Sequence, residues 1–276
     1  MRYRYVTADV FTSHAYCGNP LAVVFDAQGL STAQMQRIAR EFNYSETSFV
    51  LPPEDPAHTA RVRIFTPDRE VPFAGHPNVG TAVVLAREMA ATGLPAPDAF
   101  VFEEAAGLVR IALQKGAQDV DGAELLAPQP LSRAGEAPAA AVARALKLDP
   151  ADIDTSVHAP QVASVGLAFL VVQLASREAL RRAVPDPAGY AALLPLDGAK
   201  SIYAYTADAG GGADIQARMF TGRMTEDPST GSATAAVTAL RAALRGQGAL
   251  RLRVEQGVDM GRASVLQAHA EPRADG

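Results

Sequence analysis

Residues Glu226 to Leu240 read EDPSTGSATAAVTAL, an acidic turn followed by small residues and then by an uncharged, mostly apolar run. Asp227 and Pro228 suit the start of a helix, because aspartate caps helix N-termini and proline fits the first helical position. Gly231 and Ser232 are small enough to leave backbone N–H groups open to a ligand, and such groups attract anions. The run that follows has to be buried on most sides. The stretch therefore predicts a buried helix whose start can bind an anion.

A second copy of this pattern occurs earlier in the chain. His76–Ala82 (HPNVGTA) matches Asp227–Ala233 (DPSTGSA) position by position. Upstream of the two copies, Arg63–Thr66 (RIFT) matches Arg218–Thr221 (RMFT). An internal repeat of this kind indicates two similar halves, each with several strands and one apolar helix. A sheet wrapped around a single central helix is the economical way to bury such a helix on all sides.

The predicted fold class is therefore α+β, with two pseudo-symmetric domains that each roll a mostly antiparallel sheet around a central helix. The chain has 276 residues and is 48% hydrophobic, enough for two domains with full cores. We place the domains at residues 1–118 and 119–262, and a last strand, about 263–276, could return to the first domain. In the second half we expect a strand at 124–127 and a linker-like segment, rich in proline, at 128–138.

Composition excludes several classes of function. The net charge is −5 and the basic residues do not cluster, which disfavours nucleic acid and anionic membranes as partners. The first residues, MRYRYVTADVF, lack the apolar core of a secretory signal, and the single cysteine excludes an internal disulfide framework. The five histidines show no metal-binding spacing, and no phosphate-binding glycine motif occurs. We expect a cytoplasmic protein with no metal and no cofactor.

Five motifs, in this order along the chain, are specific in combination. They are GNPLAVV at 18–24, SETSFV at 45–50, FAGHP at 73–77, EDPSTGSA at 226–233 and QGVDMGR at 256–262. With them the chain resembles the PhzF-like family of phenazine biosynthesis, which shares the diaminopimelate epimerase fold. The resemblance implies an active site in a cleft between two similar domains. It also implies cofactor-free isomerase chemistry on a small carboxylate substrate, commonly in a homodimer.

Glu46 is the first candidate for a catalytic group. It stands between Ser45 and Thr47, ahead of apolar residues, where a strand leaves a loop. A partly desolvated carboxyl group there would have a pKa raised towards neutrality and could both take and return a proton. The resemblance assigns Glu46 this role of general acid and base. The alternative is an ordinary solvated glutamate at the end of a strand.

The two helix starts supply the other candidates. His76 and Asp227 occupy equivalent positions of the repeat, and the resemblance implies that they orient the substrate and handle protons beside Glu46. Both could instead be N-caps that stabilise their helices by about 1 kcal/mol. Gly75, Gly231 and Ser232 would offer backbone N–H groups, and Ser232 a hydroxyl, to the carboxylate of the substrate. Their alternative role is in tight turns and helix packing.

Three further considerations bear on the function. Racemases of this fold use two thiols, so the single cysteine of this chain disfavours a racemase. We expect that cysteine, Cys17, to be an ordinary buried loop residue. The family usually has threonine where this chain has Asn78, so the substrate could differ if that side chain touches it. A non-catalytic protein that binds a small carboxylate on the same scaffold is the rival interpretation. It is disfavoured because binding alone would not need Glu46.

Overall fold

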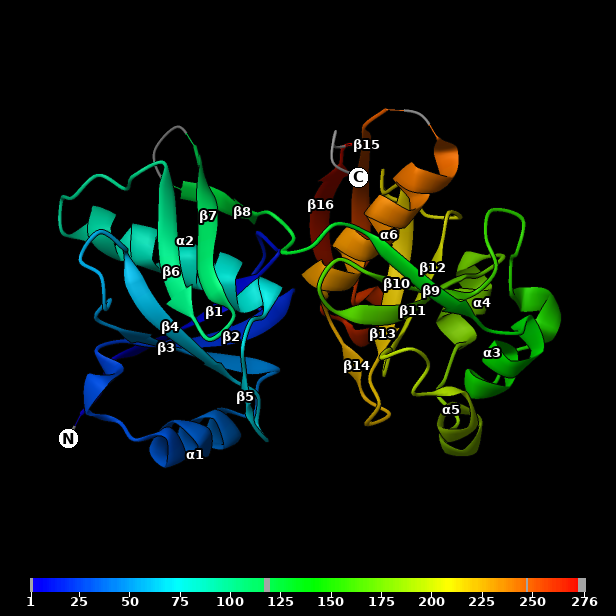
Figure 1. The fold of residues 1–276 in the computed structure, drawn as a ribbon, viewed down its shortest axis with the longest axis horizontal. Coiled ribbons are helices and arrows are strands. Elements are labelled where there is room, and N and C mark those ends of the chain that lie inside the picture. Colours follow the sequence, from blue (N-terminus) through cyan, green and yellow to red (C-terminus); the bar gives the residue numbers. More distant parts are fainter. Residues whose placement is uncertain (1, 117–119, 247, 273–276) are drawn as a thin grey trace. The chain divides into compact units, whose positions relative to one another are not determined.

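The computed structural model describes residues 2–116, 120–246 and 248–272. The chain divides between Leu126 and Ala127 into two compact units, each with its own sheet and its own long buried helix (Figure 1). The predicted α+β architecture with two similar rolled sheets is confirmed.

The first unit has a sheet with the strand order β1-β2-β3-β4-β6-β7-β8, and β5 pairs with β4. Neighbouring strands are antiparallel except for β2 with β3 and β4 with β6. The strands are β1 (Tyr5–Val10), β2 (Asn19–Val24), β3 (Glu46–Leu51), β4 (Ala60–Phe65), β5 (Glu70–Val71), β6 (Ala99–Glu104), β7 (Gly107–Lys115) and β8 (Val120–Leu125), and the helices are η1 (Ala27–Gly29), α1 (Thr32–Phe42) and α2 (Gly75–Ala91).

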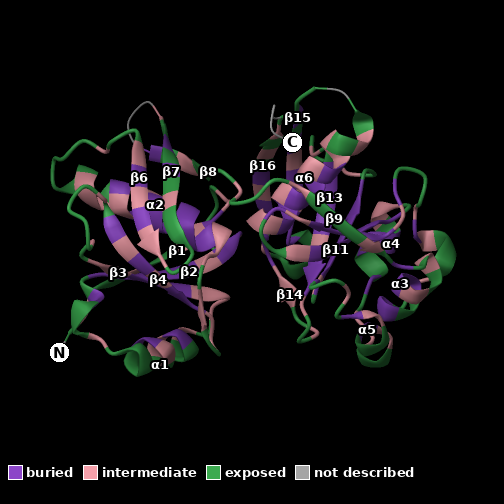
Figure 2. Cartoon of the chain, viewed as in Figure 1, coloured by how far each residue is buried: buried purple, intermediate pink, exposed green. Residues whose placement is uncertain are grey.

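Helix α2 is the centre of the first unit. Strands β1, β2, β3, β7 and β8 all contact it, and its N-terminal half is buried (Figure 2). Gly80 allows this close packing, because a Cβ atom there would lie only 2.6 Å from Leu21 Cδ2 and 2.7 Å from Val10 Cγ2. The small and apolar residues of the repeat therefore let the sheet close around the helix.

The second unit repeats this plan. Its sheet has the order β16-β15-β13-β12-β11-β10-β9, β14 pairs with β13, and the parallel pairs are β11 with β12 and β13 with β15. The strands are β9 (Ser132–Glu136), β10 (Gln161–Ser164), β11 (Ala168–Gln173), β12 (Ile202–Thr206), β13 (Ile215–Phe220), β14 (Glu226–Asp227), β15 (Leu250–Gln256) and β16 (Ser264–Ala270). The helices are α3 (Ala139–Ala145), η2 (Pro150–Asp152), α4 (Arg177–Arg182), α5 (Pro187–Leu193), α6 (Gly231–Arg245) and η3 (Val258–Met260).

The repeat extends to side-chain contacts just before each central helix. Arg63 donates two hydrogen bonds of 2.7 Å to Glu70, and its guanidinium lies 5.2 Å from the ring centre of Phe65. The equivalent Arg218 donates bonds of 2.9 and 2.7 Å to Glu226 and lies 4.8 Å from the ring centre of Phe220. In both units the ion pair joins a long strand to the two-residue strand that precedes the central helix.

The predicted organisation of the second half needs correction. The predicted boundary, between residues 118 and 119, lies outside the described residues, and the two units meet later, at Leu126 and Ala127. The strand predicted at 124–127 belongs to β8, which extends the first sheet because it pairs with β7. The segment 128–138 is not a plain linker, since its residues Ser132–Glu136 form β9 against β10. The last strand, β16, pairs with β15 in the second sheet instead of returning to the first unit.

Among the residues that the structure describes, no helix is both long enough and apolar enough to span a membrane.

Candidate active site

Glu46 is the first residue of β3, where it lies opposite Leu21 of the parallel strand β2. The strand begins here because α1 ends at Asn43, whose left-handed backbone turns the chain into the sheet. The residues that follow, Thr47 and Ser48, are fully buried, whereas the Glu46 side chain keeps 20% of its surface exposed. The carboxyl group therefore lies at the edge of the core, as the sequence predicts.

His76 brings the start of α2 against this carboxyl group. Its Nδ1 atom lies 3.4 Å from Glu46 Oε2, and its side chain is only 7% exposed. Burial lowers the pKa of His76 to about 3, so the imidazole is neutral at physiological pH. A proton on Nδ1, facing the carboxylate, leaves Nε2 as the acceptor, and this buried atom has no hydrogen-bond partner in the described part of the chain. The pair can therefore hold a proton at Glu46 and accept a hydrogen bond at His76 Nε2.

Helix α2 starts one residue before His76, at Gly75, and its N-cap residue, Ala74, provides no side-chain hydrogen bond. The first N–H groups of a helix have no partner inside the helix, and Pro77 has no N–H group. The backbone donors that the start of α2 can offer to an anion are thus those of Gly75 and His76.

Asp227 belongs to the second unit, where it ends the short strand β14 and pairs with Met219. Thr230 Oγ1 donates a hydrogen bond of 2.5 Å to Asp227 Oδ2. The fully buried Gln256 spans the same loop: its Nε2 donates to the Asp227 carbonyl at 2.8 Å, and its Oε1 accepts from the Thr230 N–H at 3.0 Å. The side chain of Gln256 therefore fixes the loop between Asp227 and α6.

The alternative role of His76 and Asp227 as N-cap residues is not found in the structure. Thr230 is the N-cap residue of α6 and Ala74 that of α2. Asp227 stays extended because it pairs with β13, whereas His76 already lies in the first turn of its helix. The two copies of the repeat thus begin their helices at different positions, and neither His76 nor Asp227 is an N-cap residue.

Gly231 and Ser232 are the first two residues of α6, so their N–H groups lie at the N-terminal end of the helix dipole. Gly257 holds the loop before them in place. Its backbone has φ of +73°, and a Cβ atom would lie 2.6 Å from the Pro228 carbonyl oxygen and 2.5 Å from that of Arg262. The close approach therefore requires glycine.

The structure groups the predicted residues within each unit. Glu46, His76 and Gly75 meet at the start of α2, and Asp227, Gly231 and Ser232 meet at the start of α6. Their union in one cleft stays a prediction. The sequence analysis did not identify Gln256, which supports the loop between Asp227 and α6, although this residue opens the motif QGVDMGR. The feature that could have identified it is a polar residue at the end of a strand, directly before a glycine.

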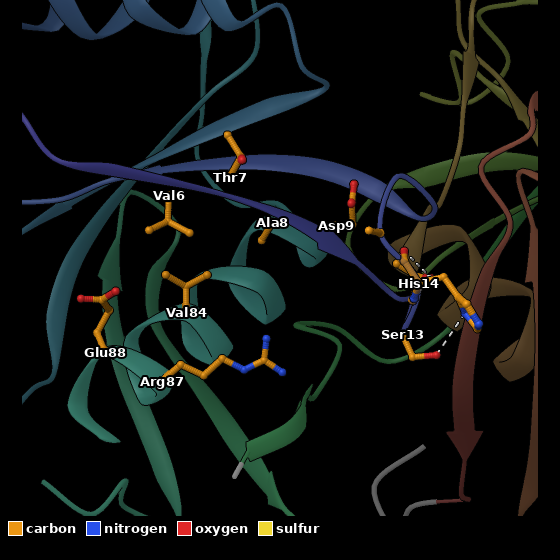
Figure 3. A pocket seen from close by; sticks show the side chains of 11 residues that line it. Val6, Thr7, Ala8, Asp9, Ser13, His14, Val84, Arg87 and Glu88 are labelled. Carbon is orange, nitrogen blue, oxygen red and sulfur yellow. Dashed lines mark hydrogen bonds between the residues drawn. The ribbon is translucent and has the colours of Figure 1, made fainter. Parts of the chain in front are cut away.

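Other features of the described residues lie apart from these groups. A pocket of about 480 Å³ is lined by β1, by residues 12–15 and by Val84, Arg87 and Glu88 of α2, and contains none of the predicted residues (Figure 3). Cys17 is half-buried, and not fully buried as expected, in the loop between β1 and β2. Within the part of the chain that the structure describes, no three His, Cys, Asp or Glu residues are grouped to bind a metal.

The family model described as phenazine biosynthesis-like protein matches residues 8–276 of this chain. The chain belongs to the PhzF-like family. An uncharacterized isomerase of Mesorhizobium japonicum is 40% identical over 275 residues, which cover 95% of this chain and 89% of that protein. The trans-2,3-dihydro-3-hydroxyanthranilate isomerase of Pseudomonas chlororaphis is 36% identical over 279 residues, 99% of this chain and 92% of that protein.

A solved structure extends the similarity to the fold. The crystal structure of a PhzF-family phenazine biosynthesis protein from Bacillus anthracis matches with a TM-score of 0.88 at 24% identity, covering 100% of this chain and 93% of that one. The two pseudo-symmetric rolled sheets are thus the diaminopimelate epimerase-like fold expected for a PhzF-like protein. With these relatives, the chain is an enzyme of a family that includes named isomerases.

Proposed function

We propose that this PhzF-like protein is a cofactor-independent isomerase that moves a proton between carbons of a small, cyclic carboxylate. The observation that carries the proposal is the contact of 3.4 Å between His76 Nδ1 and Glu46 Oε2, in which burial keeps the imidazole neutral. A carboxylate oriented by a neutral imidazole can take a proton from one carbon and give a proton to another.

In the proposed reaction, the Glu46 carboxylate removes a proton from a substrate carbon next to a conjugated or electron-withdrawing group. The electron pair of that C–H bond moves into the conjugated system, and the protonated Glu46, whose O–H exchanges with solvent, then delivers a proton to another carbon on the same face. Atoms and charge balance without an external acid or oxidant. His76 Nε2 accepts a hydrogen bond from a hydroxyl or amino group of the substrate, and Asp227 orients the opposite side.

The starts of α2 and α6 would hold the substrate carboxylate. Gly231 and Ser232 offer N–H groups at the N-terminus of α6, and Gly75 does so in α2, where the helix dipole favours negative charge. Closure of the two units around the substrate would exclude water and strengthen these interactions. We also propose that the enzyme acts in the cytoplasm as a homodimer.

The experiment is to incubate cyclic amino and hydroxy acids with the protein in deuterated water and to follow deuterium entry into carbon positions by NMR. The first compound to test is trans-2,3-dihydro-3-hydroxyanthranilate, because a relative from Pseudomonas chlororaphis is named for its isomerisation. Exchange should occur in the wild type, disappear in Glu46→Gln and persist in Glu41→Gln, a control at an exposed position of α1.

The rival function is that of a protein that binds a small carboxylate without converting it. Tight binding of panel compounds without any deuterium exchange would favour that function and contradict the proposal.

A further inference from the structure

Glu104, the last residue of β6, has a buried carboxyl group that is separate from the Glu46–His76 pair. Both of its carboxyl oxygens are inaccessible to solvent and have no hydrogen-bond partner of good geometry among the described residues. Burial raises the pKa of Glu104 to about 8, and the nearby Asn78 amide partly opposes this rise. An ionised carboxylate without a partner is costly to bury, so the neutral acid is favoured at this position.

Glu104 lies beside the start of α2. Strand β6 packs on this helix through Phe100 and Phe102, which share a core cluster with Ala82 and Ala86. The turn that follows Glu104 is also tied to the chain that leads into α2, because the N–H of Ala106 donates to the Pro72 carbonyl at 3.1 Å. The end of β6 and the start of α2 are thus held together by packing and by a backbone hydrogen bond.

Asn78 connects the two elements. It is fully buried, and its Nδ2 donates to the Ala74 carbonyl at 3.1 Å, whereas its Oδ1 has no partner in the described part of the chain. With Glu104 ionised, the two carboxylate oxygens and Asn78 Oδ1 would be three buried acceptors without a hydrogen bond of good geometry, and the approach of the Asn78 amide to the carboxylate compensates only in part. A protonated Glu104 has one O–H donor, which would satisfy Asn78 Oδ1 and complete a chain of hydrogen bonds to Ala74.

We propose that Glu104 is a positioning residue that, as a neutral acid, holds Asn78 and through it the Ala74–His76 segment, so that His76 stays against Glu46. The proposal rests on the proposed function of the Glu46–His76 pair. Ala74 is the N-cap residue of α2 and lacks a side-chain cap, so the bond of 3.1 Å from Asn78 Nδ2 to its carbonyl supports the helix start beside the longer backbone bond of 3.4 Å from the Asn78 N–H. Ionisation of Glu104 would break this chain and loosen His76.

Burial and Asn78 shift the pKa of Glu104, and no charged group is among the causes. The titratable groups on the elements packed against β6 are Arg61 and Arg63 of β4, His76, Arg87 and Glu88 of α2, and Arg110 and Lys115 of β7. A pH effect on the start of α2 near pH 8 can therefore be traced to Glu104 by mutation.

The experiment uses the full-length protein with isotope-labelled histidine. The NMR signals of the His76 ring, assigned by their loss in His76→Gln, are followed from pH 6 to pH 10. In the wild type they should shift with a midpoint near the pKa of Glu104, about 8. Glu104→Gln keeps a neutral donor at every pH, so its His76 signals should match the wild type at pH 6 and show no midpoint. The control Glu103→Gln, next in the same strand, should keep the wild-type midpoint.

A second variant tests the link itself. Asn78→Leu is similar in size but cannot pass a hydrogen bond from Glu104 to Ala74, so the midpoint at His76 should vanish as in Glu104→Gln. The proposal is overturned if the wild type shows no midpoint, or if the midpoint persists in either variant. These measurements need no substrate, so they stand even if no exchange reaction is found.

Activity gives a separate outcome. Where exchange occurs, kcat/KM of the wild type should fall about tenfold per pH unit above the pKa, while Glu104→Gln stays level over the same range. An unchanged alkaline fall in Glu104→Gln would overturn the positioning role and leave the proposed function intact. The absence of exchange on all substrates, with the NMR midpoint as expected, would instead remove the proposed function.

Discussion

His76 Nδ1 lies 3.4 Å from Glu46 Oε2, so the start of helix α2 and the start of strand β3 meet at one acid–base pair. Both residues belong to the first unit, and the contact therefore needs nothing from the second. Because burial keeps the imidazole neutral, we assign the proton transfer of the proposed reaction to the carboxyl group of Glu46. The geometry of this pair should set the rate of the proposed reaction.

Glu46→Asp should test that geometry. Removing one methylene withdraws the carboxylate by about 1.5 Å from His76 and from the substrate. Since a misplacement of about 1 Å can cost a factor of about 100, kcat should fall about 100-fold while KM changes little. Initial rates of deuterium exchange measure both constants, and Glu41→Asp on the exposed end of α1 is the matched control. An unchanged kcat would exclude Glu46 as the base.

The neutral state of His76 should also appear in the pH dependence of stability. The folded protein keeps His76 neutral down to a pKa of about 3, whereas the unfolded chain takes up the proton near its ordinary value of 6.5. The unfolded state thus binds more protons between these values, and stability should fall as pH drops from 6.5 to 3, by about 1.4 kcal/mol per pH unit from this residue.

Urea unfolding of the wild type and of His76→Gln from pH 3 to pH 7 measures this contribution. The variant should lose less stability on acidification, whereas His14→Gln, at an exposed position, should follow the wild type. Parallel curves for the wild type and His76→Gln would show that His76 is not buried in its neutral form.

The loop before α6 should be sensitive at Gly257 and tolerant at Gly261. Both residues have positive φ, 73° and 71°, so alanine at either position adds about 1–2 kcal/mol of backbone strain. At Gly257 the new Cβ would also lie 2.6 Å from the Pro228 carbonyl oxygen, whereas at Gly261 it would meet nothing within 4 Å.

Gly257→Ala should therefore lower the free energy of unfolding by about 3 kcal/mol or more, against about 1–2 kcal/mol for Gly261→Ala. Because Pro228 follows Asp227, only Gly257→Ala should also reduce the exchange rate. Thermal unfolding and exchange rates of the two variants provide the comparison. Equal effects would mean that the contact with Pro228 does not hold the loop.

Local patterns predicted the parts of the fold that local physics decides. A capping box of Ser31 and Gln34 starts α1, and Arg63 alternates with the buried residues Val62 and Ile64 in β4. The repeat predicted the two central helices. The equivalent ion pairs Arg63–Glu70 and Arg218–Glu226 show that the repeat extends to side-chain contacts. Glu46 was predicted from its place at a strand end, and the structure supplies its contact with His76.

Contacts between residues far apart in the sequence determine the features that local sequence patterns did not predict. Asp227 is followed by proline, as an N-cap would be, but its pairing with Met219 keeps it extended. The proline-rich segment 128–138 contains β9 because β10 offers it an edge, which no local signal reveals. Gln256 and Glu104 act on loops far away in sequence, so their roles required the sheet register and the burial that only the folded chain provides.

Glu104 should leave a signature in stability that is opposite to that of His76. Its folded pKa is raised to about 8 from an ordinary value of 4.5, so the folded state binds the extra proton between these values. Stability should therefore fall as pH rises from 4.5 to 8, by up to about 1.4 kcal/mol per pH unit. Glu104→Gln cannot ionise and should escape this loss.

Urea unfolding from pH 4 to pH 9 separates the two proteins. The free energy of unfolding of Glu104→Gln, measured relative to that of the wild type, should be roughly 2–4 kcal/mol higher at pH 8 than at pH 4.

Glu103 provides a control of opposite sign in the same strand, because hydrogen bonds from the N–H groups of Glu54 and Asp55 lower its pKa to about 2. The stability that Glu103 contributes is present above pH 4.5 and lost as pH falls, so Glu103→Gln should show no relative gain on the alkaline side. If Glu104→Gln and the wild type instead lose stability in parallel between pH 4.5 and pH 8, Glu104 is ionised in the folded protein, and the hydrogen-bond chain through Asn78 cannot form.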